Sequence, residues 1–247
     1  MKKIIIPALC IFILFSCQPP VENKSETTAT KKDSTIINVP SRLYGMDISV
    51  YQGDEIDLMN RKQDTLSFII CKATLGITET DPDFKNNWTL IPQKGFIRGA
   101  YHFYECGDDP KQQAQHFLSV IGTLSANDLP PILDFEQAGL GEETNITQIQ
   151  NDLLVFLSEI ETATHRTPVI YVSPDFAAIY LNNSAFAKYP LYVADYDAPN
   201  QPQIPSIWKT SSWTFWQKND TLKVDGTSND FDEFNGDRQA LQSFIHQ

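Results

Sequence analysis

The sequence has little cysteine and only one long apolar run, which lies at its start. Two of the four cysteines, Cys10 and Cys17, belong to that first segment, and no CxxC pair occurs. This excludes a disulfide framework and a cysteine-based zinc site. Cys71 and Cys106 leave room for one bridge, although the apolar run around Cys71 favours a small buried thiol there.

Positive charge is also scarce. The chain carries 19 Lys and Arg against 31 Asp and Glu, a formal net charge of -12. This balance argues against nucleic acid and anionic lipid surfaces as partners and favours a substrate that is neutral or tolerates negative charge. The four histidines lack metal-ligand spacing, so we expect no metal. Without GxSxG, Walker or GxGxxG motifs, serine-hydrolase and nucleotide-binding functions have no support, and we expect no cofactor.

Residues 1–16 have the pattern of an export signal. The basic start MKK precedes the apolar stretch IIIPALCIFILF, which is short for a membrane span. The segment ends in LFSC, which resembles the lipobox of bacterial lipoproteins. That resemblance implies cleavage before Cys17 and acylation of this cysteine, and Gln18 after it argues against inner-membrane retention. An ordinary secretory signal with an incidental cysteine is the alternative.

Residues 17–40 are rich in Ser, Thr, Lys, Glu and Pro, with few large apolar residues. Such a composition cannot bury a core, so it predicts a flexible tether. Residues 41–247 suit a single domain. We therefore expect a monomer that is attached to a membrane through lipid on Cys17 and located in the cell envelope, on the periplasmic or surface side of the outer membrane.

Short apolar runs alternate with stretches of helical spacing from residue 43 onward. Several runs are apolar on both faces, as strands buried on both sides are. The expected strands are 43–48, 67–73, 97–104, 130–136, 168–173, 191–196 and 213–217. The expected helices lie within 83–95, 109–122, 145–164 and 173–183. Repeated strand–helix units predict an α/β fold with mostly parallel strands. About seven or eight strands in one domain favour a closed or nearly closed TIM-like β/α barrel over an open doubly wound sheet.

Polar residues fall where these strands end. Because the carboxyl ends of barrel strands line the active mouth, we expect these residues to share one rim. They are Asp47, Lys72, His102, Asp134, Glu136 and Asp195. Taken singly, Asp47 could cap a turn with Ser49, and His102 fits a hydrogen-bonded core histidine better than a metal ligand.

The run LPPILDFEQ ends with Asp134 and Glu136, two carboxylates on alternate residues. Residues two apart on a strand point to the same side, with backbones about 6–7 Å apart. Carboxylates held this close raise the pKa of one of them, and a protonated Glu beside an ionised Asp suits glycoside hydrolysis. The alternative is a strand end in solvent, against which two prolines and the apolar approach argue. The spacing does not separate retaining from inverting chemistry.

Five motifs occur in order between residues 44 and 236. They are GMDISVYQG (45–53), FIICKATLG (68–76), GAYHFY (99–104), PPILDFE (130–136) and FWQ (215–217). In this order and spacing, the chain resembles the lysozymes of glycoside hydrolase family 25, the Chalaropsis type. The resemblance implies a flattened β/α barrel, no metal, and cleavage of the β-1,4 bond between N-acetylmuramic acid and N-acetylglucosamine in peptidoglycan glycan strands.

The resemblance also implies roles for single residues. Glu136 matches the general acid, and Asp134 matches the carboxylate that steers the substrate acetamido group or stabilises charge beside it. Asp47 matches an acid on the first strand that shapes the local field. The late aspartate of the family falls on Asp230, with Asp232 as the alternative, although Asp232 taken singly fits a turn acid.

Four further residues match substrate-contacting positions of the family. Lys72 matches one contact, and Tyr101, Tyr171 and Trp216 match aromatic walls of the groove, whose faces suit the CH groups of a sugar ring. Taken singly, Tyr101 and Trp216 are more typical of core residues. Departures from the family pattern, which bear on sugar and peptide preference, occur at Tyr51, Leu58, Leu75 and Asp195.

Three functions are consistent with these patterns. We favour an active muramidase. A carbohydrate-binding barrel without activity is the second, although such a protein would be expected to lack Asp134 or Glu136. Another barrel glycosidase, such as a chitinase, is the third, but the longer Asp-rich strand motif of chitinases is absent. Remodelling of the protein's own wall, attack on competitors and processing of ingested wall all fit the first function.

Overall fold

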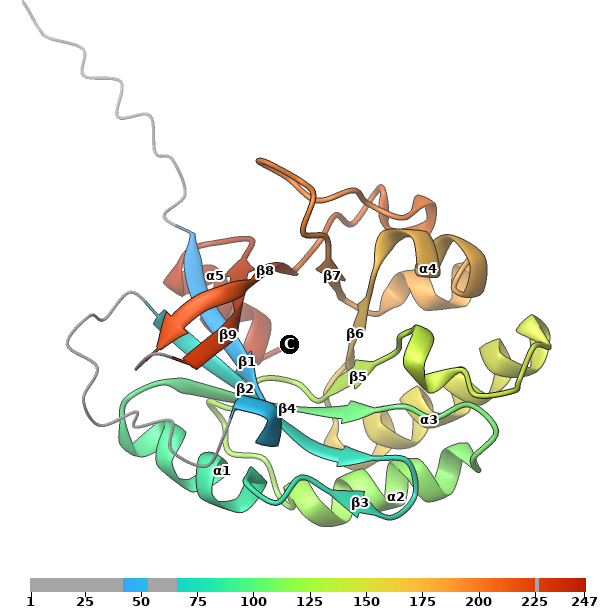
Figure 1. The fold of residues 1–247 in the computed structure, drawn as a ribbon, viewed down its shortest axis with the longest axis horizontal. Coiled ribbons are helices and arrows are strands. Elements are labelled where there is room, and N and C mark those ends of the chain that lie inside the picture. The colour runs from blue at the N-terminus through green and yellow to red at the C-terminus, as the bar shows by residue number, and fades with distance from the viewer. Residues whose placement is uncertain (1–41, 53–65, 225–226) are drawn as a thin grey trace, which may run out of the picture. The chain divides into compact units, whose positions relative to one another are not determined.

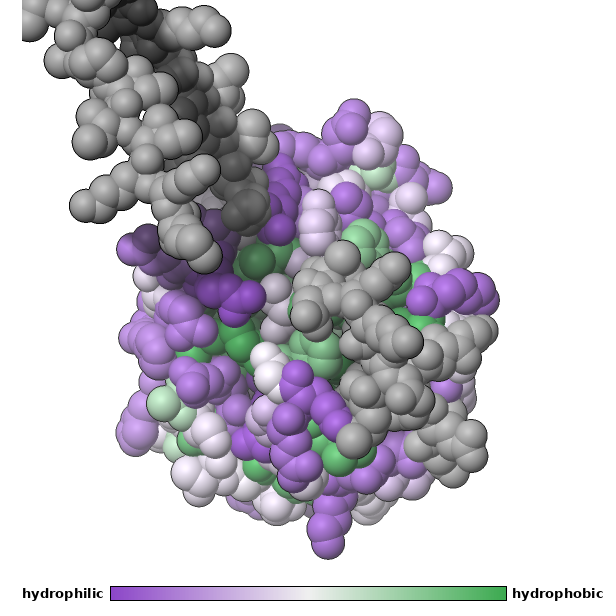
Figure 2. All heavy atoms as spheres, turned by 90° about the vertical axis from the view of Figure 1, so that its left-hand side faces the viewer, coloured by the Kyte–Doolittle hydropathy of each residue, from purple (hydrophilic) through white to green (hydrophobic). Residues whose placement is uncertain are grey.

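A computed structural model describes residues 42–52, 66–224 and 227–247 of the chain (Figure 1). The expected signal (1–16), the lipidation site Cys17, the tether (17–40) and Leu58 lie outside the described residues. Within the described part, no helix combines the length and the apolar character needed to cross a membrane. On the face shown in Figure 2, hydrophilic residues dominate the described surface.

The described residues contain one nine-stranded sheet. Its strands are β1 (Leu43–Ile48), β2 (Leu66–Leu75), β3 (Glu79–Thr80), β4 (Ile97–Phe103), β5 (Ile132–Asp134), β6 (Val169–Val172), β7 (Leu191–Ala194), β8 (Phe215–Val224) and β9 (Thr227–Phe234). The order is β1-β9-β8-β7-β6-β5-β4-β2-β3, and an additional pairing of β1 with β2 closes the sheet into a barrel, with β3 appended to β2.

Most strand pairs are parallel, which confirms the predicted α/β barrel. Every pair along the path β1–β2–β4–β5–β6–β7–β8 is parallel. Only β9, which is antiparallel to both β8 and β1, and the short β3 depart from this pattern. The barrel is therefore completed by a C-terminal hairpin rather than by another strand–helix unit.

The seven predicted strands are all present, but several details differ. Strands β5 and β7 end at Asp134 and Ala194, each two residues before its predicted end, and β8 continues from the predicted stretch to Val224. The two-residue β3 was not predicted. Strand β9 was not predicted, because its sequence TSNDFDEF is rich in Asp and Asn, which strands generally avoid. Pairing on both sides and burial inside the barrel outweigh this weak local preference.

Helices surround the barrel (Figure 1). They are α1 (Phe84–Gln93), α2 (Pro110–Ile121), α3 (Ile146–Thr164), α4 (Pro174–Tyr180) and α5 (Arg238–Ile245), with single 3-10 turns η1 (Val50–Gln52), η2 (Gln137–Gly139), η3 (Ser184–Lys188) and η4 (Ser206–Trp208). The first four were predicted, and α5 was not. Helix α2 begins where the Asp109 side chain accepts from the backbone N–H groups of Lys111 and Gln112, and it ends at Gly122 with φ 64°.

Alternation along the strands divides the core into an inner and an outer part. The inner part fills the barrel below its mouth and is closed by apolar residues of α5. Its members include Phe68, Ile132, Val169, Phe215, Phe234, Leu241 and Phe244. The outer part lies between the strands and the surrounding helices and includes Leu133, Phe135 and Phe156.

His102 belongs to this outer core. Its Nδ1 lies 2.7 Å from the Thr74 hydroxyl oxygen and its Nε2 lies 3.1 Å from Gln113 Oε1. Burial lowers the pKa of His102 to about 3, so the ring is neutral. The interpretation of His102 as a hydrogen-bonded core histidine is confirmed, and it does not share the polar rim. Cys71 and Cys106 are both free thiols, and Cys71 is buried.

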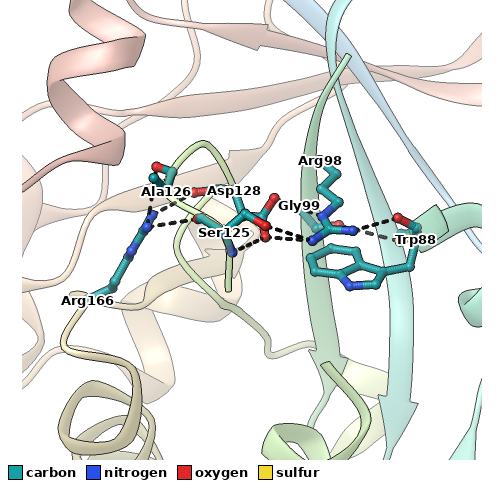
Figure 3. Close-up of polar contacts among 8 residues, drawn as sticks. Trp88, Arg98, Gly99, Ser125, Ala126, Asp128 and Arg166 are labelled. Carbon is teal, nitrogen blue, oxygen red and sulfur yellow. Dashed lines mark hydrogen bonds and ion pairs between the residues drawn. The ribbon is translucent and has the colours of Figure 1, made fainter. Parts of the chain in front are cut away.

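A partly buried ionic cluster connects the segments at the amino ends of the strands (Figure 3). Arg98 of β4 donates to both carboxylate oxygens of Asp128, at 2.8 and 3.0 Å, and its guanidinium lies 3.9 Å from the centre of the Trp88 ring. Arg166 donates to the carbonyl oxygens of Asp128 and Ile245, at 2.7 and 3.0 Å. The cluster thereby joins the chain before β5 to α5.

Loss of Arg98 should destabilise the fold strongly. We expect Arg98→Ala to lower the free energy of unfolding by about 3–5 kcal/mol, because it leaves the buried Asp128 carboxylate without its cation. Lys111→Ala, which breaks the exposed Lys111–Glu159 pair, is the control and should cost less than about 1 kcal/mol. Urea unfolding measures both values, and equal small losses would contradict the prediction.

Candidate active site

A cavity of about 220 Å³ opens at the carboxyl ends of the parallel strands. The residues that line it are Asp47, Tyr101, Ile132, Asp134, Glu136, Tyr171, Tyr192, Tyr196, Gln217 and Asp230. The structure thus brings together the four predicted acids and two of the predicted aromatic walls, Tyr101 and Tyr171. Within the described residues, no group of three or more His, Cys, Asp or Glu is arranged to hold a metal ion.

Asp134 and Glu136 face the same cavity, as their alternate spacing predicted. Strand β5 ends at Asp134, but the backbone stays extended at Glu136, with φ -141° and ψ 172°. Ile132, Asp134 and Glu136 therefore point inward, while Leu133 and Phe135 pack in the outer core. Asp134 is buried, whereas Glu136 is only half-buried, so the pair extends from the floor of the cavity to its mouth.

A close backbone approach fixes the chain just after Glu136. A Cβ on Gly139 would lie 2.1 Å from the carbonyl oxygen of Tyr104, so this position requires glycine. The Cys106 N–H donates to the carbonyl of Gly139 at 2.7 Å. The turn that follows Glu136 is thus held against the end of β4, which orients the glutamate at the mouth.

Gln217 organises the opposite side of the cavity around Asp47. Its Nε2 donates to Asp47 Oδ2 at 2.6 Å, and its Oε1 accepts from the hydroxyls of Tyr171 at 2.8 Å and Tyr196 at 2.6 Å. The reverse amide orientation would set an oxygen against the Asp47 carboxylate, so this arrangement is the favourable one. Asp47 is therefore part of a hydrogen-bonded network and not the cap of a turn.

Burial raises the pKa values of the three acids Asp47, Asp134 and Glu136. Burial raises the pKa of Asp47, against which hydrogen bonds from Gln217, Tyr192 and Asp230 act. Burial, followed by the charges of Glu136 and Asp47, raises the pKa of Asp134. Burial also raises the pKa of Glu136, and the charge of Asp47 acts in the same direction. The site therefore retains protons at pH values where isolated carboxyl groups would have lost them.

Strand β9 supplies two more carboxyl groups. Asp230 lines the cavity and hydrogen-bonds to Asp47, and burial together with the Asp47 charge raises the pKa of Asp230 to about 8. Asp232 lies deeper, fully buried opposite Gly45 of β1, with Oδ1 2.6 Å from the Tyr192 hydroxyl. The interpretation of Asp232 as a turn acid is therefore wrong, because this residue lies inside the unpredicted strand.

Lys72 is the nearby cation that counteracts these shifts. Its charge lowers the pKa values of Asp134 and Glu136. The Nζ atom lies 4.8 Å from the centre of the Phe103 ring and 5.9 Å from that of the exposed Tyr51. Lys72 is thus held beside the cavity by aromatic faces, although it does not line the cavity itself.

Trp216 is not in the cavity. Its side chain is 0% exposed, and its Nε1 donates to the carbonyl of Asp195 at 2.9 Å. Because Gln217 points inward, its neighbour Trp216 points outward and packs edge-on against Trp213. The expected role in the groove wall is corrected to that of a core residue. Asp195 also does not line the cavity; its side chain accepts from the Gln203 N–H at 2.8 Å.

Sequence reasoning assigned no role to three polar residues of the cavity. Gln217 stands in the FWQ motif, directly beside the tryptophan that received the role instead. Tyr192 lies between outward-facing Leu191 and Val193, so alternation along the strand 191–196 places it inside. Tyr196 is the last residue of that predicted stretch and lies two residues beyond the end of β7. The signals for all three were present in the spacing.

A closed β/α barrel with carboxyl groups of raised pKa clustered at the carboxyl ends of its strands is the arrangement that glycoside hydrolases of the barrel class use. Residues 46–227 match the model of "Glycosyl hydrolases family 25", and the chain belongs to this family. The protein is therefore a glycoside hydrolase.

Known relatives agree with this assignment in sequence and in fold. "Lysozyme M1" of Streptomyces globisporus is 34% identical over 211 residues, covering 81% of this chain and 70% of that protein. The "N,O-diacetylmuramidase" of Chalaropsis sp is 30% identical over 200 residues, covering 75% and 92%. The solved structure of a muramidase from Acremonium alcalophilum superimposes with a TM-score of 0.75 at 31% identity, covering 83% of this chain and 99% of that one.

The raised pKa of Asp230 makes stability depend on pH. In the folded protein this pKa is about 8, against 3.8 for an ordinary Asp. Between these values only the folded state holds the proton, so stability falls as pH rises from about 4 to about 8. Asp230→Asn removes that loss, and its melting temperature should exceed that of the wild type by about 2–4 °C or more at pH 8 and by less at pH 5.

Asp197→Asn is the matched control, because Asp197 is an exposed carboxyl group outside the cavity. It should leave the pH dependence of melting unchanged. Thermal unfolding of the three proteins at several pH values gives the comparison. A parallel pH dependence for wild type and Asp230→Asn would show that Asp230 is ionised in the folded protein at neutral pH.

Proposed function

We propose that this enzyme is a peptidoglycan hydrolase that cleaves the β-1,4 bond between N-acetylmuramic acid and N-acetylglucosamine, with Glu136 as general acid and Asp134 as assisting carboxylate. The observation that carries the proposal is the unequal placement of the two acids. Glu136 stands half-buried at the mouth, and Asp134 lies buried on the floor with Oδ1 unpartnered among the described residues. The names of the Streptomyces and Chalaropsis relatives support the choice of substrate.

In this mechanism, the different environments of Glu136 and Asp134 give the two acids different roles. Burial raises the pKa of Glu136, so the group holds a proton that it can give to the glycosidic oxygen. The unpartnered Oδ1 of Asp134 would accept the N–H of the substrate acetamido group, which satisfies a buried acceptor on binding. The Asp134 charge would then stabilise positive charge as the bond breaks.

A groove of about 470 Å³ beside the cavity suggests how the glycan strand lies. Of the four acids in the cavity, only Glu136 also lines the groove, together with Tyr171 and Tyr196. Because Glu136 protonates the leaving oxygen, the cavity would hold the sugar whose anomeric bond breaks and the groove would hold the leaving sugar. Phe176, Ile179 and Ala194 supply an apolar wall to the groove.

The expected location fits this substrate. An enzyme tethered through lipid on Cys17 by residues 17–40 would act in the cell envelope, where peptidoglycan lies. The tether would keep the barrel within reach of glycan strands without embedding it in the membrane.

Replacement of Glu136 tests the reaction. Wild-type residues 41–247 should release soluble fragments from purified peptidoglycan, and borohydride reduction followed by mass spectrometry should identify reduced muramic ends. Glu136→Gln should lower the rate by about 10²–10⁴-fold, because it removes the proton donor. Reduced glucosamine ends would show that a different bond is cleaved. Sedimentation of both proteins with the wall, without soluble products, would indicate a binding barrel instead.

Replacement of Ile179 tests the position of the leaving sugar. Ile179 is 51% exposed, so Ile179→Asp should leave the melting temperature unchanged while lowering kcat/KM on soluble glycan fragments about 10-fold through lost contact with the sugar. Ile146→Asp is the matched control, since Ile146 is 37% exposed and does not line the groove. Equal kcat/KM values for the two variants would place the leaving sugar elsewhere.

A further inference from the structure

We propose that Asp232, which lies below the cavity, is a positioning residue that stays protonated at neutral pH and thereby makes Tyr192 donate its only proton to Asp47. Asp47 is then held as an anion beneath the general acid. The assignment of these protons follows from the distances in the buried network. The effect of the Asp47 charge on Glu136 rests on the proposed function.

One hydroxyl group lies between two carboxyl groups. The Tyr192 oxygen is 2.6 Å from Asp232 Oδ1 and 2.9 Å from Asp47 Oδ2, and all three side chains are buried. Both distances are hydrogen-bond distances, but a hydroxyl has one proton to donate. Tyr192 can therefore donate to one carboxylate only, and the other carboxyl group must be the donor to Tyr192. One of the two acids is consequently protonated.

The other partners of these acids indicate which one carries the proton. Asp47 Oδ2 also accepts from Gln217 Nε2 at 2.6 Å, and Asp230 hydrogen-bonds to Asp47, so this carboxylate is stabilised as an anion. Asp232 Oδ2 is buried without a partner among the described residues. An ionised carboxylate with a bare buried oxygen is far more costly than a neutral acid with the same defect. The proton therefore belongs to Asp232.

The charges around Asp232 favour the same assignment. Among the described residues, the titratable groups that act on it are Asp47 from β1, Asp230 from β9 and Tyr192 from β7, and none of these is a cation. Arg42 and Lys218 pair with the next residue, Glu233, whose side chain alternates to the other side of β9. Burial and the charge of Asp47 raise the pKa of Asp232 and outweigh the opposing effect of its hydrogen bond with Tyr192.

The protonation of Asp232 affects the general acid Glu136 through the charge of Asp47. The Asp47 charge raises the pKa of Glu136, which keeps the Glu136 proton in place. If Tyr192 donated to Asp232 instead, Asp47 would be the neutral partner and this effect would be lost. Asp232 thus acts on the reaction without touching substrate.

Infrared difference spectroscopy tests the proton on Asp232 directly and requires no activity. The spectrum of the wild type minus that of Asp232→Asn at pH 7 should show the carbonyl band of a protonated carboxylic acid. Carboxylate bands in the same difference spectrum would overturn the proposal. Because the amide N–H of Asn can replace the acid as donor to Tyr192, Asp232→Asn should keep kcat within about 3-fold of the wild type.

The pH profile of kcat tests the effect on Glu136. Tyr192→Phe removes a donor from Asp47, so Asp47 holds its proton to higher pH and the pKa of Glu136 falls. The alkaline limb should move to lower pH by about 0.5 unit or more, while Asp232→Asn should leave it in place. Tyr104→Phe is the matched control, because Tyr104 has a buried hydroxyl that is unpartnered among the described residues, in the outer core.

The results distinguish a failure of the link from Asp232 to Glu136 from a failure of the proposed function. An unchanged limb in Tyr192→Phe, with a native melting temperature, would overturn the link from Asp232 to the general acid. A shifted limb in Asp232→Asn would show that Asp232 acts through a negative charge, which also overturns the proposal. Failure of Glu136→Gln to lose activity would refute the proposed function but would leave the infrared result standing.

Discussion

Mutual repulsion among carboxyl groups at one end of the barrel is the constraint to which the rest of the site responds. Four acids line the cavity, and Asp232 lies directly beneath it. Lys72 is the cation that lowers the pKa values of Asp134 and Glu136. Full ionisation of such a group would be prohibitive, so the site depends on shared protons and on neutral donors such as Gln217 and Tyr192. The same condition raises the pKa of Glu136, the proposed general acid.

The two ends of the barrel differ in how fully their buried polar groups are paired. At the amino ends of the strands, Arg98 and Arg166 are matched by carboxylate and carbonyl oxygens, and α5 fills the opening with apolar side chains. Both guanidinium groups have oxygen partners there, which suits a structural role. At the carboxyl ends, Asp134 and Asp232 each keep a buried oxygen unpartnered among the described residues. Unfavourable electrostatics at the mouth are tolerated because the other end and the double core carry the stability.

The barrel and the pair of acids could be predicted from short-range patterns in the sequence. Short apolar runs between helical stretches indicated the strands, and the two-residue spacing of Asp134 and Glu136 gave their common direction. Tyr101, Tyr171 and Asp230 were expected in the site only through the family resemblance. The hairpin β8–β9 could not be predicted, because polar residues such as Asp230 and Asp232 are buried there only through pairing with distant strands. Trp216 shows the limit of motif reasoning. It lies beside Gln217, and a shift of one residue decides which of the two faces the cavity.

The network around Gln217 also connects the groove to the acids. Tyr171 and Tyr196 line both the cavity and the groove, and their hydroxyls donate to Gln217 Oε1. The Nε2 atom of the same amide donates to Asp47. Tyr196 is 50% exposed, so a sugar in the groove would contact it directly. A ligand that drew its hydroxyl away would remove one donor from Gln217 and leave the amide held by Tyr171 and Asp47 alone. Occupation of the groove and the electrostatic state of Asp47 are therefore physically linked, through hydrogen bonds that a purely apolar groove would not provide.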